Sequence, residues 1–334
     1  MIIGINKETD HFFLAICKIG WHSFLMLGVY DNFQVSHLLC RVGKFFDLSD
    51  RTGMEKYLKS YGALCGAIFS GSKAKIKDEG ISKKHIGQAP ITYQAYDITY
   101  EQYCEFVHYL EAIQTEKNRF QCFKPFVQDG NTIHFTQTSA RVFPSHSLSP
   151  DLYTELHEIS TSSTCRHTAI NLVKTVTKSP TLPLVSPHFF INLPYKTQLD
   201  YGKPSKNIPF YVLPPPPHPL PQIGYSAVDK KKHLIARQLY HRMENLLLID
   251  ESTLSTVQKF NSLKNCYLQI IGSQKKQSID ELLLSIQQWK EENKENLQTL
   301  RRVYFWDFFI IRESATMQLI NKIEEDLKHT KCSY

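Results

Sequence analysis

The sequence predicts an α+β protein, in which an antiparallel β-sheet with helices is followed by an α-helical C-terminal domain. Three observations lead to this class. Apolar runs rich in Val, Ile, Leu and Phe follow one another over residues 11–46, with turn residues between them. A cluster of small hydroxyl residues precedes Cys165 and then gives way to apolar residues at helical spacing. From residue 228 onward the helical spacing dominates.

The composition is that of a globular protein with a sizeable core. The chain has 334 residues, of which 42% are hydrophobic and 12% aromatic, enough for two domains. The net charge of +7 arises from 39 basic and 32 acidic residues, which are interspersed along most of the sequence. A nucleic-acid-binding protein usually concentrates its basic residues in a stripe interleaved with aromatic residues. The sequence lacks such a stripe, so we expect no nucleic-acid partner.

The eight cysteines are scattered, and none belongs to a C-x-x-C pair. This spacing argues against a zinc module and a disulfide framework, and it favours a reducing compartment. No secretory signal is visible, because Lys18 and His22 interrupt the apolar stretch 12–30. We therefore expect no metal and no cofactor, and a protein that functions in a reducing cytosol.

The first predicted elements form a β-meander. Its three strands are expected at residues 12–19, 22–30 and 34–45. Gly20 and the Asp31-Asn32 pair separate these strands, and both are typical of turns. None of the strands alternates cleanly between apolar and polar residues. We therefore expect them to be buried on both faces of the sheet.

The next part of the chain predicts two helices and a strand. A short helix is expected near residues 52–61, then an apolar run at 63–69, a basic loop at 73–84 and a strand at 91–98. Thr99 and Gln102 form a capping box, after which aromatic and aliphatic residues recur at helical spacing. We expect this aromatic stripe to belong to the core and not to a binding platform.

One or two strands around residues 131–142 precede the helix that begins near Cys165. Ser162, Ser163 and Thr164 can each cap a helix, and the apolar residues that follow cover one helix face. Cys165 is therefore expected in the first turn, where unpaired N–H groups and the helix dipole favour the thiolate. A cysteine there can be a nucleophile near neutral pH, whereas most free cysteines are small buried hydrophobic residues.

The segment 179–224 contains twelve of the sixteen prolines, which exclude a helix or a central strand. It is expected to run over the surface in extended form. Two interpretations are open: a stiff polyproline II spacer, or a ligand for a groove that recognises such helices. Its many apolar and aromatic residues indicate that much of it packs against the first domain.

The helical pattern of the last third predicts a bundle or a helical cap. Helices are expected at residues 234–248, from 252 or 253 to 270, from 278 to beyond 300, and at 317–327, with a strongly aromatic stretch at 303–311. Residues 246–249 and 303–311 are apolar enough to contact a membrane, but packing inside the helical domain is the expectation.

The chain is thus expected to have three parts. They are a core at residues 1–178, a Pro-rich connector packed on the core at 179–226, and a helical domain at 227–334. The oligomeric state does not follow from the sequence.

Cys165, His22 and His37 form the candidate catalytic set. A thiolate nucleophile needs a histidine that takes its proton, and that histidine needs a third group to fix its tautomer. His22 lies in a predicted strand, where backbone hydrogen bonds hold it rigidly, and His37 lies in the next strand. Side chains on adjacent antiparallel strands can come within reach of each other. We expect His22 to be the general base and His37 its orienter.

This order of residues resembles the circularly permuted papain-like hydrolases of the NlpC superfamily. The lecithin retinol acyltransferase-like branch carries a strand histidine, a second histidine about a dozen residues later, and an Asn-Cys-Glu-His-Phe motif. The matching stretches are Trp21-His22-Ser23, His37 and Thr164-Cys165-Arg166-His167-Thr168. The resemblance covers residues 10–178. It implies a papain-like antiparallel sheet with a nucleophile helix, with Cys165, His22 and His37 as nucleophile, base and orienter.

The sequence departs from the family pattern at three points. Thr164 replaces asparagine, Arg166 replaces glutamate, and the spacing from His22 to His37 is longer than usual. Gln34, which stands at the usual spacing, is the rival orienter. Acyl transfer to lipids is not implied by this match.

The two-part layout, the Pro-rich connection and the helical extension also resemble translocated effector proteins of the Legionella type. The acidic stretch 323–327 with its polar end is similar to the C-terminal signal of such effectors. The resemblance implies a bacterial protein that enters a host cell by type IV secretion, without a cleaved signal peptide. Its substrate or partner would then be a host protein.

Two functions from different classes are compatible with these features. The first is a cysteine-dependent hydrolase or acyl transferase of the protease or amidase type, which cleaves a protein amide or isopeptide through a thioester on Cys165. Backbone N–H groups at the helix start could form its oxyanion hole. The second is a non-catalytic interaction protein that uses a degenerate papain-like scaffold. The separation of the Cys165 sulfur from the His22 ring distinguishes the two.

Overall fold

The structure is a computed structural model. It describes residues 1–47, 71–82, 87–144, 148–179, 182–219, 226–249, 253–272, 277–300 and 312–331. The chain divides into two compact units, Met1–Pro215 and Pro216–Tyr334. Antiparallel sheets and helices make up the first, and the described part of the second is helical, which confirms the α+β class. Because the first unit extends to Pro215, it includes most of the Pro-rich segment.

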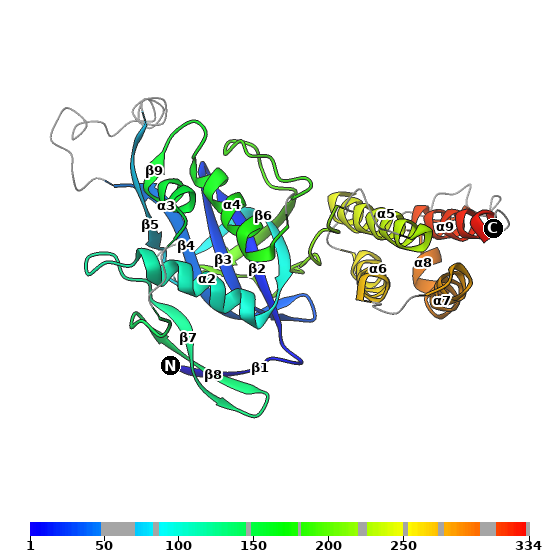
Figure 1. Cartoon of the computed structure of the whole chain (residues 1–334), viewed down its shortest axis with the longest axis horizontal. Helices are drawn as coiled ribbons and strands as arrows, with labels where there is room; N and C mark the ends of the chain where they lie inside the picture. The colour runs from blue at the N-terminus through cyan, green and yellow to red at the C-terminus, as the bar shows by residue number, and fades with distance from the viewer. Residues whose placement is uncertain are drawn as a thin grey trace. The chain divides into compact units, whose positions relative to one another are not determined.

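The first unit is organised around one large antiparallel sheet (Figure 1). Among the described residues its strand order is β11-β10-β6-β2-β3-β4-β5-β9. These strands are β2 (His11–Ile19), β3 (His22–Asp31), β4 (Gln34–Phe46), β5 (Ser72–Asp78), β6 (Gln88–Ile98), β9 (Glu158–Ile159), β10 (Tyr195–Asp200) and β11 (Lys203–Pro204). A smaller sheet has the order β1-β8-β7, formed by β1 (Ile2–Asn6), β7 (Cys122–Asp129) and β8 (Thr132–Thr138).

The hairpin of β2 and β3 runs through the middle of the large sheet. Ile19 and His22 close it around a two-residue turn, in which Gly20 has a φ of +54°. Such a φ suits glycine because it has no Cβ. Both strands are buried along nearly their whole length, which confirms the expected burial on two faces. This burial also explains why their sequences do not alternate.

Helices cover one face of the sheet (Figure 1). They are α2 (Tyr100–Ile113), α3 (Pro150–His157) and α4 (Cys165–Thr177). The predicted capping box of Thr99 and Gln102 begins α2. On this helix Tyr103 is fully buried, and its ring centroid lies 5.7 Å from that of Phe12 on β2. The aromatic stripe of α2 is therefore core, as predicted.

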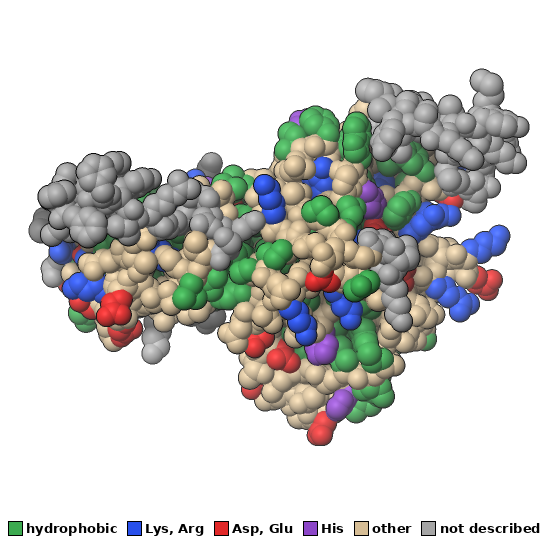
Figure 2. All heavy atoms as spheres, turned by 180° about the vertical axis from the view of Figure 1, so that it is seen from behind, with side chains coloured by type: hydrophobic (Ala, Val, Ile, Leu, Met, Phe, Trp, Pro, Cys, Tyr) green, Lys and Arg blue, Asp and Glu red, His purple; other side chains and the backbone are tan. Residues whose placement is uncertain are grey.

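The end of the Pro-rich segment, residues 205–213, covers the opposite face of the sheet. Phe210 stacks on Tyr93 with 4.5 Å between ring centroids, and the Tyr211 N–H donates to the Tyr93 hydroxyl at 2.8 Å. The edge strand β11 holds Pro204, where a missing N–H costs no bond of the ladder. Figure 2 views the molecule from behind and shows basic and acidic side chains interspersed among the described residues.

Two sequence predictions for the first unit need correction. The basic loop expected at residues 73–84 begins instead as strand β5. The lysines of β5 alternate with Ala74 and Ile76, which are each 3% exposed and belong to the core. Burial of every second residue is the pattern of a strand. Helix α3 was missed, although Ser149 caps it and Pro150 occupies its first turn. The predicted elements at 52–61 and 63–69 lie outside the described residues.

The described part of the second unit consists of helices. They are α5 (Ala227–Ile249), α6 (Leu254–Gly272), α7 (Ile279–Glu292), α8 (Lys294–Gln298) and α9 (Ala315–Lys331). α5 packs against α6 and α7 against α9. Ser278 and Glu281 form the predicted capping box of α7. Leu246 and Leu247 are buried, and the stretch 303–311 lies outside the described residues. No helix within the described ranges is long and apolar enough to cross a membrane.

A buried ion pair joins the small sheet to α2. The Lys124 ammonium donates to Glu111 Oε1 and to the carbonyl of Ala140, both at 2.6 Å, and both charged side chains are nearly inaccessible. Glu111 also accepts the backbone N–H groups of Val142 and Phe143. The carboxylate therefore organises the loop after β8, and its charge depends on Lys124 for compensation.

Lys124→Met should lower the free energy of unfolding by about 3–5 kcal/mol, because it leaves the Glu111 carboxylate buried without a cation. Urea unfolding followed by circular dichroism measures this change. Lys117→Met, at an exposed turn position, is the control and should stay within about 0.5 kcal/mol of the wild type. Equal stability of the two variants would contradict the role of the pair.

Candidate active site

Cys165 is the first residue of α4, as the hydroxyl cluster before it predicts. Thr164 is the N-cap, and its side chain accepts the His167 N–H at 3.4 Å. The His167 side chain accepts in return from the backbone N–H of Thr164, which completes a capping box. The backbone N–H groups of the first two helical residues have no partner within a helix.

The Cys165 sulfur lies at the open end of the β3–β4 ladder. The pairing of these strands ends at Phe24 and Gly43, so the next N–H on β3, that of Ser23, is left outside the ladder. It donates to Cys165 Sγ at 3.4 Å. The sulfur thus takes the place of the missing strand partner, and the start of α4 is fixed to the start of β3.

The structure brings Cys165 and His22 together, as the sequence predicted. The two side chains lie close enough for each to shift the pKa of the other. The His22 ring also contacts Glu79, whose Oε1 lies 2.5 Å from His22 Nε2. Because Nε2 is occupied by Glu79, Nδ1 is the nitrogen that can exchange a proton with the sulfur. A thiol, an imidazole and a carboxylate therefore stand in series, which is the order that an activated thiol nucleophile requires.

Glu79 is the functional residue that sequence reasoning missed. It follows β5 directly, its side chain is 3% exposed, and its second oxygen lies 3.3 Å from Arg41 Nη2. The Arg41 guanidinium in turn stacks 4.3 Å above the ring of Phe24. The carboxylate is thus held from behind by a buried cation. The pattern of β5 does not indicate this burial, because Glu79 falls in phase with Lys75 and Lys77 and not with the buried Ala74 and Ile76.

The absence of a side chain at Gly43 makes this contact possible. Glu79 reaches His22 across β4, and Gly43 lies on β4 between them. A Cβ at Gly43 would overlap Glu79 Oε1 and stand only 2.6 Å from His22 Nε2. The glycine therefore serves a close approach of two side chains and not a turn.

The expectation that His37 orients His22 was wrong. His37 is exposed and pairs with Val29, seven residues along β3 from His22, which is roughly 23 Å at strand spacing. The rival Gln34 pairs with Asp31, still farther away. In an antiparallel hairpin the residues nearest the turn pair with each other, so a histidine at the start of β3 meets the end of β4. Phe45 lies there, with its ring centroid 4.6 Å from that of His22.

The electrostatics favour a thiolate and an imidazolium. Burial opposes the charged form of His22, but hydrogen bonds with Cys165 and Glu79 and their negative charge raise its pKa to about 9. Burial likewise opposes the Cys165 thiolate. The hydrogen bond and charge of His22, the Ser23 N–H and the charge of Arg166 outweigh burial and lower the pKa of Cys165. Between the two pKa values the pair is ionic.

An exposed aromatic cluster lies beside the site. Trp21, next to His22, is 50% exposed, and its ring centroid lies 6.0 Å from that of Phe189. Phe190 is 60% exposed and packs edge-on against Phe189. The cluster offers apolar surface to whatever approaches the sulfur.

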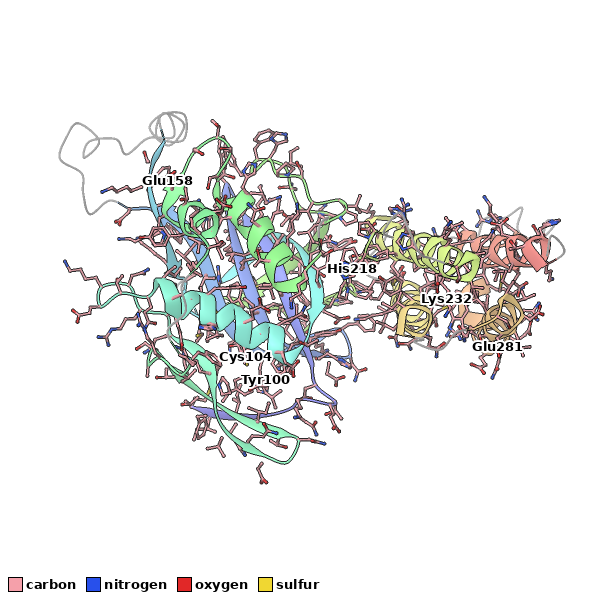
Figure 3. The ribbon with its side chains drawn as sticks, viewed as in Figure 1. Tyr100, Cys104, Glu158, His218, Lys232 and Glu281 are labelled. Carbon is pink, nitrogen blue, oxygen red and sulfur yellow. The ribbon has the colours of Figure 1, made fainter. Side chains whose placement is uncertain are left out.

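The other thiols of the described chain differ from Cys165. They are free thiols like Cys165, and they belong to Cys17, Cys40, Cys104, Cys122 and Cys266. Cys104 is on α2 next to Tyr100 (Figure 3), and burial raises its pKa to about 11 even though Tyr100 donates to it. Within the described residues, no group of three or more His, Cys, Asp or Glu side chains could hold a metal ion.

No protein-family model, no curated protein and no solved structure matches the chain. The chemistry of this site is therefore inferred from its own geometry.

Gly43→Ala should displace Glu79 and His22 and slow the alkylation of Cys165 by iodoacetamide about tenfold at pH 6. One unit of thiol pKa is a factor of ten in thiolate. The fold should persist, because the overlapping carboxylate is the end of a flexible side chain. Gly4→Ala, whose Cβ would meet nothing closer than 3.4 Å, is the matched control. An unchanged rate in Gly43→Ala would show that the glycine has no such role.

Glu79→Gln should lower the pKa of His22 from about 9 by about one unit or more, because it removes the anion that stabilises the imidazolium. The glutamine keeps an oxygen for Arg41, so the fold should survive. The pKa is measured by an NMR titration of the histidine rings, with His22→Gln to assign the signal. Glu101→Gln, on the first turn of α2, should leave the His22 titration unchanged. A His22 pKa that is the same with and without Glu79 contradicts the assignment.

Proposed function

We propose that the chain is a cysteine-dependent hydrolase or acyl transferase of the protease or amidase type. The observation that carries the proposal is the series of contacts from Cys165 Sγ through the His22 ring to the Glu79 carboxylate. A hydrogen-bonded base held by a buried acid is the general arrangement of an activated thiol nucleophile. The antiparallel sheet with a cysteine at the start of a packed helix supports a papain-like core.

The geometry supports a two-step reaction. The thiolate attacks the substrate carbonyl, and a C–S bond forms while the oxygen becomes negative. Backbone N–H groups at the start of α4, which have no partner within the helix, would stabilise that charge. His22 then gives its proton to the leaving nitrogen, the C–N bond breaks, and a thioester remains on Cys165. In the second step His22 takes a proton from water or another acceptor, which attacks the thioester and releases the thiolate.

A protein amide or isopeptide is the substrate that we propose. The exposed Trp21 and Phe190 flank the site and suit an apolar side chain next to the cleaved bond. The sulfur is positioned by the start of β3 and the start of α4, and such fixed elements suit the narrow geometry of acyl transfer.

The resemblance to the NlpC superfamily is part of the proposal. The order of a strand histidine followed by a helix-start cysteine supports it. The orienter departs from the family, because Glu79 comes from beyond β5 and not from the strand next to His22. The Pro-rich segment and the helical unit support the further proposal that the chain is a translocated bacterial effector acting on a host protein.

A non-catalytic interaction protein is the second candidate. Exposed large apolar side chains on the helical unit favour it, among them Leu254 at 71% and Leu284 at 65% exposure. Exposed apolar residues on helices are a common feature of partner-binding surfaces. In this case the Cys165 site would be a scaffold without turnover.

Trapping of an acyl-enzyme distinguishes the two candidates. Incubation with p-nitrophenyl acetate should add one acetyl group to Cys165, detected by intact-protein mass spectrometry and removed by neutral hydroxylamine. Cys165→Ala should lose the adduct, and His22→Ala should form it about a hundredfold more slowly.

Cys104→Ala is the control, since the pKa of its thiol is raised to about 11, and it should behave as the wild type. Acetylation of another cysteine before Cys165, or none at all, would refute the enzymatic proposal and leave the interaction protein.

A further inference from the structure

Arg166, the residue after the nucleophile, is a fully buried cation. Its side chain is inaccessible to solvent, and its guanidinium donates three hydrogen bonds. Nε donates to Ser23 Oγ at 2.9 Å, Nη1 to the carbonyl of Ser186 at 3.1 Å and Nη2 to the carbonyl of Ile191 at 3.1 Å. All three acceptors are neutral oxygens.

A buried guanidinium without an anion is costly, and buried charges are normally paired. No carboxylate in the described structure forms an ion pair with Arg166, whose recorded contacts are the three neutral oxygens. Burial lowers the pKa of Arg166 to about 10, so the side chain remains a cation at neutral pH. Its positive charge must therefore be balanced by another kind of group.

Two thiols interact electrostatically with Arg166, and only one can supply the charge. Cys17 is completely buried, and burial raises its pKa far above the neutral range, so it remains a neutral thiol. Cys165 has the lowered pKa and lies next to Arg166 in the chain. Ser23 connects Arg166 with Cys165, because the Ser23 hydroxyl accepts from Arg166 Nε and the Ser23 N–H donates to the Cys165 sulfur.

We propose that Arg166 is the buried counter-cation of the Cys165 thiolate, a positioning residue that keeps the sulfur ionised. The proposal rests on the proposed function, since it concerns the same nucleophile. Two cations, His22 and Arg166, then interact with the sulfur. His22 gives up its proton during the reaction, whereas Arg166 keeps its charge through every step.

The remaining charged groups near the sulfur do not replace Arg166. On β4, Lys44 donates to four oxygens of α3, of the loop that follows it and of α4, and burial lowers its pKa to about 8. Glu155 and Glu158 lie near Lys44 and offset its charge. On β2, Lys18 donates to Asn192 Oδ1 at 2.8 Å. The other charged or titratable groups are Glu79 and Arg41 behind His22, and His167, whose pKa burial lowers.

The test is the pH dependence of iodoacetamide alkylation of Cys165 in the full chain, read by mass spectrometry for the wild type and three variants. Arg166→Met should raise the thiol pKa by about one unit, which slows alkylation about tenfold at pH 6 and little at pH 10. Arg166→Lys keeps a cation and should shift the pKa by less than half as much. Lys174→Met, which removes a positive charge from the far end of α4, should leave the profile unchanged.

The outcomes separate this inference from the proposed function. A low wild-type thiol pKa that Arg166→Met does not change overturns the counter-cation and leaves the enzyme standing. Equal shifts in Arg166→Met and Arg166→Lys also overturn it, because the charge would then not matter. An ordinary thiol pKa in the wild type refutes the proposed function itself.

Thermal unfolding of each variant checks the fold. If Arg166→Met does not fold, Arg166→Gln serves in its place, since it removes the charge and keeps an amide donor for the same oxygens. It should raise the thiol pKa by about one unit, and an unchanged thiol pKa overturns the proposal.

Discussion

The hydrogen bond from the Ser23 N–H to the Cys165 sulfur is the contact on which the geometry of the site depends. It exists because the β3–β4 ladder ends one residue too early to use that N–H, and because a helix begins at the same place. Lys44 secures the arrangement from β4, since its ammonium binds oxygens of Glu155, Ser163 and Thr168. The sheet, the loop before the helix and the helix start are thus fixed as one rigid corner.

Positive and negative side chains alternate in this part of the structure. Each interacts with the next in the order Arg41 (cation), Glu79 (anion), His22 (cation), Cys165 (anion) and Arg166 (cation). Each charge is stabilised by its neighbours, and most of the line is shielded from water, where such interactions are stronger. The two ends are held by groups that carry no net charge, the Phe24 ring at Arg41 and three neutral oxygens at Arg166. The reactive pair occupies the middle.

Local sequence signals singled out Cys165 and His22 but not Glu79, the carboxylate that contacts the His22 ring. The hydroxyl residues before Cys165 predict a helix start, and Gly20 predicts the turn that places His22 at the beginning of a strand. Which residue orients His22 depends on the register of the neighbouring strands. The hydrophobic pattern does not determine that register, because these strands are buried on both faces. Glu79 was not predicted, because the lysines of β5 were interpreted as part of a loop. Its contact with His22 also passes over a glycine on the strand between them, which the sequence does not reveal. Only a three-dimensional arrangement relates residues 22, 79 and 165.

The segment that covers the back of the sheet has a consequence for how the protein is made. Residues 205–213 supply Phe210 and Tyr211 to a face built mostly from the first hundred residues. Phe13 and Tyr93 remain uncovered until the ribosome has added residues 205–213. By then Cys165 and His22 have already been synthesised. Nascent chains of this length therefore expose aromatic surface that invites aggregation or chaperone binding. Maturation is complete only when a stretch far from the reacting atoms has docked.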